Sequence, residues 1–182
     1  MKQEGHFEQI HRKRGNIIKN AHVEDQLPKE YDEALQLLEA YLHQEQKRNT
    51  IERRFILEVL YRLNTPVDAD TLHELVCKLK GTVSLTTVYH TIDLLVSLRL
   101  AKRIDLLSNG MSFYEKTLGM EPHGYVICQK CGGISLLYRP DLLNALRLTL
   151  PRGFQPEDYT LHVHGLCSKC KRIRRRRKEA DQ

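Results

Sequence analysis

The sequence predicts an α+β fold in two parts, a larger helical domain followed by a smaller mixed α/β domain. Amphipathic segments fill residues 31–98 and end in two extended segments, and two Cys-x-x-Cys pairs follow beyond residue 120. The 182 residues suffice for one large domain or two small ones. Because no apolar run approaches the roughly 18 residues of a membrane span and no secretory signal opens the chain, we expect a cytoplasmic protein without a membrane partner.

Apolar residues that recur every third or fourth position predict four helices in the first part. The helices are expected from Tyr31 to the basic pair at 47–48, from Thr50 to about residue 64, from Asp68 or Asp70 to Gly81, and from Ser84 to residue 98. Thr50, Asp68 and Ser84 are residue types that cap helix N-termini, so they are the expected starts.

The fourth helix separates its apolar and polar residues onto opposite faces. Leu85, Val88, Ile92 and Leu95 form the apolar face, and Thr86, His90 and Asp93 form the polar face. Extended segments at 101–106 and 111–115 follow, joined by Ser108-Asn109-Gly110, and Asn-Gly between such segments is a strong hairpin signal. Helices followed by a hairpin are the layout of a winged helix-turn-helix.

The second part contains all the paired cysteines. Strands are expected at 125–128, 133–138 and 159–165, with a helix at 141–148. Cys128 and Cys131 form one Cys-x-x-Cys pair, and Cys167 and Cys170 form the other. Two such pairs supply the four soft ligands of a closed tetrahedral Zn²⁺ site, so structural zinc is the expected cofactor. A redox pair and an iron–sulfur centre are the alternatives, and Cys77 is expected to be a buried core thiol.

Positive charge gathers at one end of the sequence. The net charge is +6, and residues 169–178 contain eight basic residues in ten. This block is either a solubilising tail or an arm that binds nucleic-acid phosphates without sequence preference. The expected organisation is a flexible polar arm at 1–30, a winged-helix domain at 31–117, a zinc-binding domain at 118–172 and a basic tail at 173–182.

Several short motifs, taken in order, resemble those of the ferric uptake regulator (Fur) family of bacterial metal- and peroxide-responsive repressors. They are Ser84-x-x-Thr87-Val88-Tyr89, Tyr114-Glu115, His123 before Cys128-x-x-Cys131-Gly132, and Gly165-x-Cys167-x-x-Cys170. The similarity covers about residues 35 to 172. It implies a C-terminal α/β dimerisation domain and a homodimer on a palindromic double-stranded DNA operator. It also implies repression of metal-homeostasis or stress genes.

The resemblance places the predicted fourth helix in the major groove of DNA. The residues it implies for DNA binding are Thr86, Thr87, Tyr89 and His90, with Lys102 and Arg103 at the base of the hairpin. The alternatives are that the threonines favour the helix start, that Tyr89 packs under the hairpin, and that the two basic residues are solvated. Family members usually carry Arg where this chain has His90, which removes a fixed charge from the predicted contact.

The family's regulatory metal ligands are mostly replaced in this chain. Glu115 and His123 persist, whereas Pro122 and Tyr125 stand where histidines are usual. His162 and His164 alternate along one predicted strand and can complete a second divalent-metal site with Glu115 and His123. The alternatives are that these histidines are polar surface residues and that the regulator is independent of metal.

Two other classes of protein compete with a DNA-binding regulator. A zinc-ribbon-type module could bind nucleic acid or protein through its Arg-rich tail, but it needs neither the Thr-Val-Tyr helix nor the Asn-Gly hairpin. An enzyme is not expected, since the sequence lacks a phosphate-binding loop, a nucleophile–base set and an open metal position.

Overall fold

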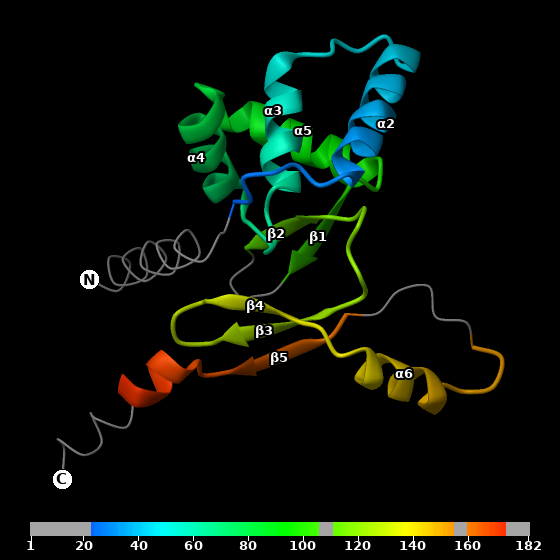
Figure 1. Ribbon diagram of the computed structural model, residues 1–182, viewed down its shortest axis with the longest axis vertical. Helices are drawn as coiled ribbons and strands as arrows, with labels where there is room; N and C mark the ends of the chain where they lie inside the picture. Colours follow the sequence, from blue (N-terminus) through cyan, green and yellow to red (C-terminus); the bar gives the residue numbers. More distant parts are fainter. Residues whose placement is uncertain (1–22, 106–110, 155–159, 174–182) are drawn as a thin grey trace. The chain divides into compact units, whose positions relative to one another are not determined.

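The computed structural model describes residues 23–105, 111–154 and 160–173 (Figure 1). The chain divides into two compact units, with the division between Met120 and Glu121. The predicted arm up to residue 22, the Asn-Gly turn and the tail from residue 174 lie outside the described residues. In the described ranges, no helix is long and apolar enough to cross a membrane.

The first unit is a winged helix-turn-helix, as predicted. Its elements are α2 (Glu30–Gln44), α3 (Ile51–Tyr61), α4 (Ala69–Lys80), α5 (Leu85–Ser97), β1 (Ala101–Asp105) and β2 (Ser112–Lys116). Asp68 caps α4 by accepting the Thr71 N–H at 2.9 Å, and Ser84 caps α5 by accepting the Thr87 N–H at 3.1 Å. Thr50 is the N-terminal capping residue of α3, as predicted, although its side chain makes no capping hydrogen bond.

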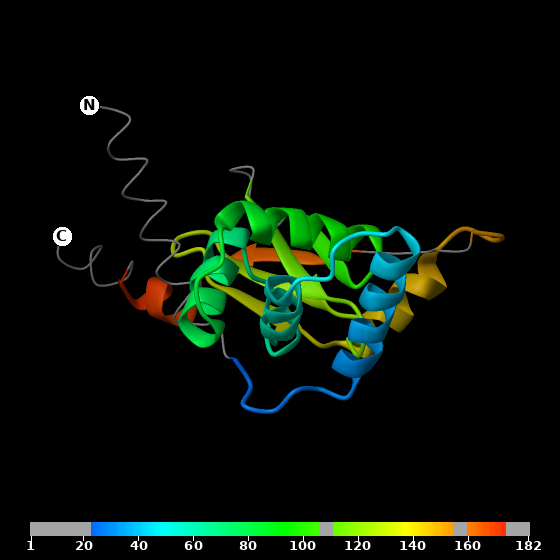
Figure 2. The same cartoon turned by 90° about the horizontal axis from the view of Figure 1, so that it is seen from above.

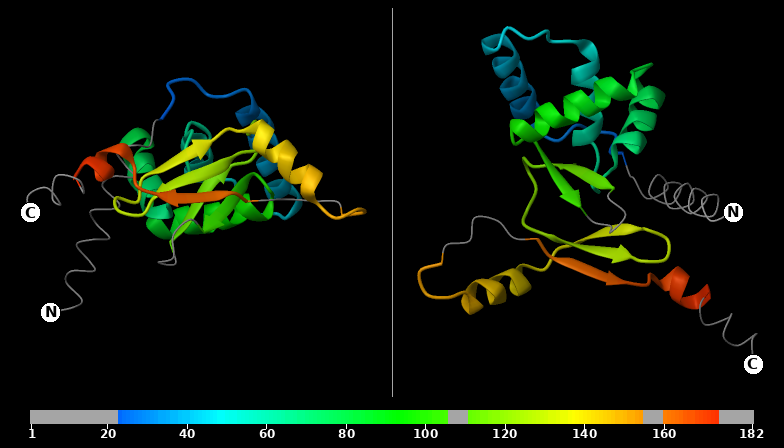
Figure 3. Two further views of the ribbon diagram at one scale, coloured as in Figure 1. Left: turned by 90° about the horizontal axis from the view of Figure 1, so that it is seen from below. Right: turned by 180° about the vertical axis from the view of Figure 1, so that it is seen from behind.

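The core of this unit lies between the helices. Helices α3, α4 and α5 pack on one another, and α2 packs on α3 (Figures 2 and 3). Fully buried side chains include Leu38, Leu57, Leu72, Ile92 and Leu95. The predicted apolar face of α5 is confirmed from Val88 onward, but its first residue, Leu85, remains 37% exposed.

Hydrogen bonds, several of them buried, connect the hairpin to the helices. β1 pairs with β2 antiparallel, and the backbone of Val67 exchanges hydrogen bonds of 2.9 and 2.8 Å with Tyr114. Lys116 Nζ donates to the Tyr61 carbonyl at 2.7 Å, and the Tyr61 hydroxyl donates to the Leu100 carbonyl at 3.0 Å. Burial lowers the pKa of Lys116 and raises the pKa of Tyr61 to about 12. These bonds hold the base of the hairpin against the end of α3.

The second unit is a small sheet with one longer helix and a helical segment over the described residues 168–173. It contains β3 (Gly124–Cys128), β4 (Ile134–Leu137), α6 (Pro140–Thr149) and β5 (His162–Gly165). The strand order is β4-β3-β5, with β3 antiparallel to β4 and parallel to β5. A Cβ on Gly124 would lie 2.9 Å from the Leu161 carbonyl oxygen, so only glycine fits where β3 begins. The observed β5 is shorter than predicted, and Tyr159 lies outside the described residues.

Candidate metal centre and DNA-binding surface

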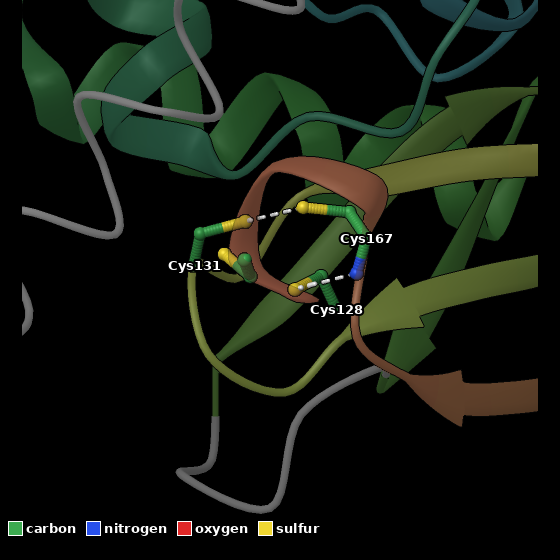
Figure 4. Close-up of side chains that lie close together, drawn as sticks. Cys128, Cys131 and Cys167 are labelled. Carbon is green, nitrogen blue, oxygen red and sulfur yellow. Dashed lines mark hydrogen bonds between the residues drawn. The ribbon is translucent and has the colours of Figure 1, made fainter. Parts of the chain in front are cut away.

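The two cysteine pairs meet at one end of the small sheet (Figure 4). Cys128 ends β3, and Cys167 follows the end of β5. Because β3 and β5 run parallel, with Cys128 in register with Gly165, both pairs leave the sheet at the same edge. The four Sγ atoms lie within 4.8 Å of one another, and those of Cys131 and Cys167 are 3.9 Å apart. A tetrahedral zinc ion with bonds of about 2.3 Å spaces its sulfurs about 3.8 Å apart.

Backbone groups help to shape this cluster. The Cys167 N–H donates to Cys128 Sγ at 3.3 Å, and the Gln129 N–H donates to the Gly165 carbonyl at 2.9 Å. The turn after Cys131 needs the left-handed backbone of Gly132, whose φ is 73°. Among the residues that the structure describes, the four cysteines are the one group of three or more side chains suited to a metal ion.

The thiol pKa values show why the cluster fits a cation. Burial raises the pKa of Cys128, but N–H groups of Cys167, Cys131 and Lys130 outweigh burial and lower it to about 6. Burial and the neighbouring sulfurs raise the pKa of Cys170 to about 12. Four thiolates therefore coexist near neutral pH only around a positive ion. The cluster can hold a structural zinc, and four sulfurs leave that ion no open catalytic position.

The polar face of α5 is exposed. Thr86, His90 and Asp93 all reach solvent. Thr87 is partly buried, and its hydroxyl lies 2.8 Å from the Ser84 hydroxyl at the helix start. These contacts favour the helix-starting role for Thr87, whose contact with DNA stays a prediction. Thr86 and His90 stand on the exposed face.

The remaining residues predicted to contact DNA differ in exposure. Tyr89 is 42% exposed, so it is not fully packed under the hairpin. Lys102 is partly buried, and the exposed Arg103 places its Nε 3.7 Å from Asp105 Oδ1. This exposed ion pair contributes little to stability and leaves the guanidinium accessible to a phosphate.

The histidines predicted for a second metal site gather on one face of the small sheet. Because a carbonyl oxygen only accepts, His123 Nδ1 donates to the Glu121 carbonyl at 2.7 Å, and its Nε2 accepts the Tyr125 hydroxyl at 3.2 Å. The Tyr125 ring lies 5.7 Å from that of His162, which lies 6.2 Å from that of His164. The three imidazoles are thus linked through a tyrosine, a contact that depends on strand register and has no signal in the sequence.

Glu115, the fourth predicted ligand of that site, belongs to the first unit. It lies in β2 opposite Lys102 and is only 6% exposed. The second metal site stays a prediction.

Cys77 differs from its prediction as a buried core thiol. It is only partly buried, and its Sγ lies 3.4 Å from His73 Nε2, one helical turn earlier on α4. The i, i+4 spacing of the two residues was the sequence signal that could have revealed this pair.

The fold and the cysteine cluster together define the class of protein. It is a regulator of two units, one with a winged helix and the other with a closed metal centre. The family model for the ferric uptake regulator family matches residues 44–164. The chain therefore belongs to the ferric uptake regulator family of transcriptional regulators.

Individual relatives agree with this assignment. The ferric uptake regulation protein of Bacillus subtilis (strain 168) is 28% identical over 134 residues, covering 71% of this chain and 89% of that protein. The peroxide-responsive repressor PerR of Staphylococcus aureus (strain USA300) is 25% identical over 132 residues, covering 72% of this chain and 87% of the repressor. The Helicobacter pylori ferric uptake regulator Fur, whose structure has three functional metal-binding sites, shares the fold: its TM-score is 0.71 at 19% identity, covering 81% of this chain and 97% of that chain.

Proposed function

We propose that this protein is a cytoplasmic, homodimeric, sequence-specific DNA-binding repressor and not an enzyme. In this proposal α5 reads a palindromic operator in the major groove, and structural zinc maintains the second unit. Metal-homeostasis or stress genes are the expected targets, in keeping with the names of the relatives. The observation that carries the proposal is the exposed polar face of α5, which begins at a capped N-terminus and precedes a hairpin.

The side chains on this face suit base recognition. Thr86 and His90 lie one helical turn apart near the N-terminal end of α5, the end that recognition helices present to base edges. A hydroxyl and an imidazole can each donate and accept hydrogen bonds, so both can read the groove edge of a base pair. Arg103, exposed on β1, is suited to contact a phosphate.

Operator selection with the zinc-loaded full chain tests this proposal. Random duplex DNA is enriched by binding, and the selected sequence is compared with a scrambled one by affinity at fixed salt. We expect a palindromic consensus, and His90→Ala should weaken binding to it by roughly 5- to 150-fold, the equivalent of about 1–3 kcal/mol per base contact. Glu74→Ala, an exposed change on α4, is the matched control and should bind as the unmodified chain does. Equal affinity for selected and scrambled DNA would overturn the proposal.

A further inference from the structure

A sulfur, a nitrogen and an oxygen converge at the turn between α4 and α5. His73 Nε2 lies 2.7 Å from the Val83 carbonyl oxygen, and Cys77 Sγ lies 3.4 Å from that nitrogen and 3.6 Å from that oxygen. His73 and Cys77 are one turn apart on the same face of α4. Both side chains are partly buried, so the group is sheltered while each side chain keeps some contact with solvent.

We propose that His73, Cys77 and the Val83 carbonyl form a second metal site, for a thiophilic divalent cation of the zinc type. Thiolate and imidazole are the ligands that such ions prefer, and two side chains at i and i+4 on a helix chelate one ion. This site shares no residue with the four-cysteine centre and none with His123, His162 or His164.

The observed distances come close to those that an ion requires. A tetrahedral ion with bonds of about 2.3 Å to sulfur and about 2.1 Å to nitrogen and oxygen needs about 3.6 Å from the sulfur to each other ligand. The Cys77 sulfur already lies 3.4 and 3.6 Å from its two neighbours. The nitrogen and oxygen, now 2.7 Å apart in a hydrogen bond, would have to separate to about 3.4 Å.

The protons of both side chains can be accounted for when the ion binds. Without the ion, the His73 Nε2–H and the Cys77 S–H both face the Val83 oxygen, which accepts from them. The cation displaces the thiol proton to solvent, and the imidazole carries its remaining proton on Nδ1 while Nε2 binds the ion. A water completes the coordination, as is usual where a protein supplies three ligands.

The site is placed to influence the DNA-binding helix. Val83 immediately precedes Ser84, whose hydroxyl caps α5. Widening the His73–Val83 contact therefore shifts the residue before the cap, and the position of α5 shifts with it. We expect the bound ion to weaken operator affinity by at least about fivefold, the lower end of typical couplings between two binding sites. This consequence rests on the proposed DNA-binding function, whereas ion binding does not.

Cobalt is the probe for the ion itself. Co²⁺ is titrated into the reduced full chain loaded with one zinc per chain, because zinc outcompetes cobalt for the four-cysteine centre and the second site is then left to cobalt. We expect one additional Co²⁺ per chain, with a sulfur-to-cobalt charge-transfer band. Cys77→Ser should lose that band and His73→Gln should weaken binding by at least about tenfold, whereas Glu74→Gln should leave both unchanged. Circular dichroism checks that each variant remains folded.

Two results would overturn this site. One is the absence of a sulfur-to-cobalt band in the unmodified chain, and the other is a band that persists in Cys77→Ser. Operator affinity is then measured with and without Co²⁺. Weaker operator binding with Co²⁺ in the unmodified chain but not in Cys77→Ser supports the coupling. Unchanged or tighter binding in the unmodified chain, or an equal loss in Cys77→Ser, contradicts it. If the chain binds no DNA sequence selectively, the proposed function fails while the cobalt stoichiometry still decides the metal site.

Discussion

The two units of this protein differ in how much apolar surface they bury. Every member of the large core cluster among the described residues lies between Tyr31 and Tyr114, in the winged-helix unit. The described part of the second unit buries Tyr125, Ile127, Ile134 and two of the metal-site cysteines. Small domains with so little buried apolar surface commonly depend on a metal or another cross-link. We therefore expect packing to stabilise the first unit and the ion to stabilise the second.

Loss of the metal ion should produce the largest difference in stability between the two units. Cys128→Ser removes one of four thiolate ligands, and because metal-binding free energy is folding free energy in such sites, the second unit should unfold completely. Metal analysis should show loss of the tightly held zinc, and hydrogen exchange should show loss of protection in β3, β4 and β5 but not in α3 or α5. Glu74→Gln, an exposed change outside both proposed metal sites, is the control and should keep its zinc. A Cys128→Ser chain that stays folded without metal would contradict the dependence of the second unit on its ion.

A large-to-small change in the packed core should give the opposite pattern. Ile92 is fully buried in α5, so Ile92→Ala should lower the free energy of unfolding of the winged-helix unit by about 2–5 kcal/mol. Zinc content should not change. Chemical denaturation followed by far-ultraviolet circular dichroism measures the stability, and zinc loss in this variant would show that the two units are not independent.

The two units should also contribute differently to DNA binding. Replacing the four arginines at 174–177 with Gln removes basic side chains that follow the second unit in the sequence, while α5 is unchanged. The slope of log affinity against log salt should become shallower by up to about 3.6, or about 0.9 for each phosphate that the tail no longer neutralises. The preference for selected over scrambled DNA should persist. An unchanged slope would indicate a tail that only solubilises the protein.

A pair of threonines tests the polar groups within the packed unit. Thr71 and Thr91 are both 1% exposed, but the Thr71 hydroxyl donates to Asp68 at 2.9 Å, whereas the Thr91 hydroxyl finds no hydrogen-bond partner among the described residues. Thr91→Val should therefore raise the free energy of unfolding by about 1 kcal/mol, and Thr71→Val should lower it by about 1–3 kcal/mol. Denaturant midpoints measure both changes, and the same sign for both variants would contradict this explanation.

The sequence predicted the elements better than the contacts between them. The helices follow from apolar spacing and from caps such as Ser84, both of which involve residues a few positions apart. The four cysteines could be assigned because their chemistry identifies them without a known fold. In contrast, the pairing of Tyr125 with His162 joins residues of separate strands, and the approach of Cys77 to Val83 depends on the path of the turn between α4 and α5. Neither leaves a local pattern in the sequence.

The parallel pairing of β3 with β5 has a consequence for the order in which the two units fold during synthesis. Cys131 and Cys167 are 36 positions apart. Because protein synthesis adds about 5–20 residues per second, the second cysteine pair is made roughly 2–7 seconds after the first. Throughout that interval the earlier unit, with its largely local helical contacts, is able to fold. The zinc ion then binds late and joins two segments that are far apart in the nascent chain. Cells short of zinc would accumulate molecules whose first unit is folded and whose second unit is not.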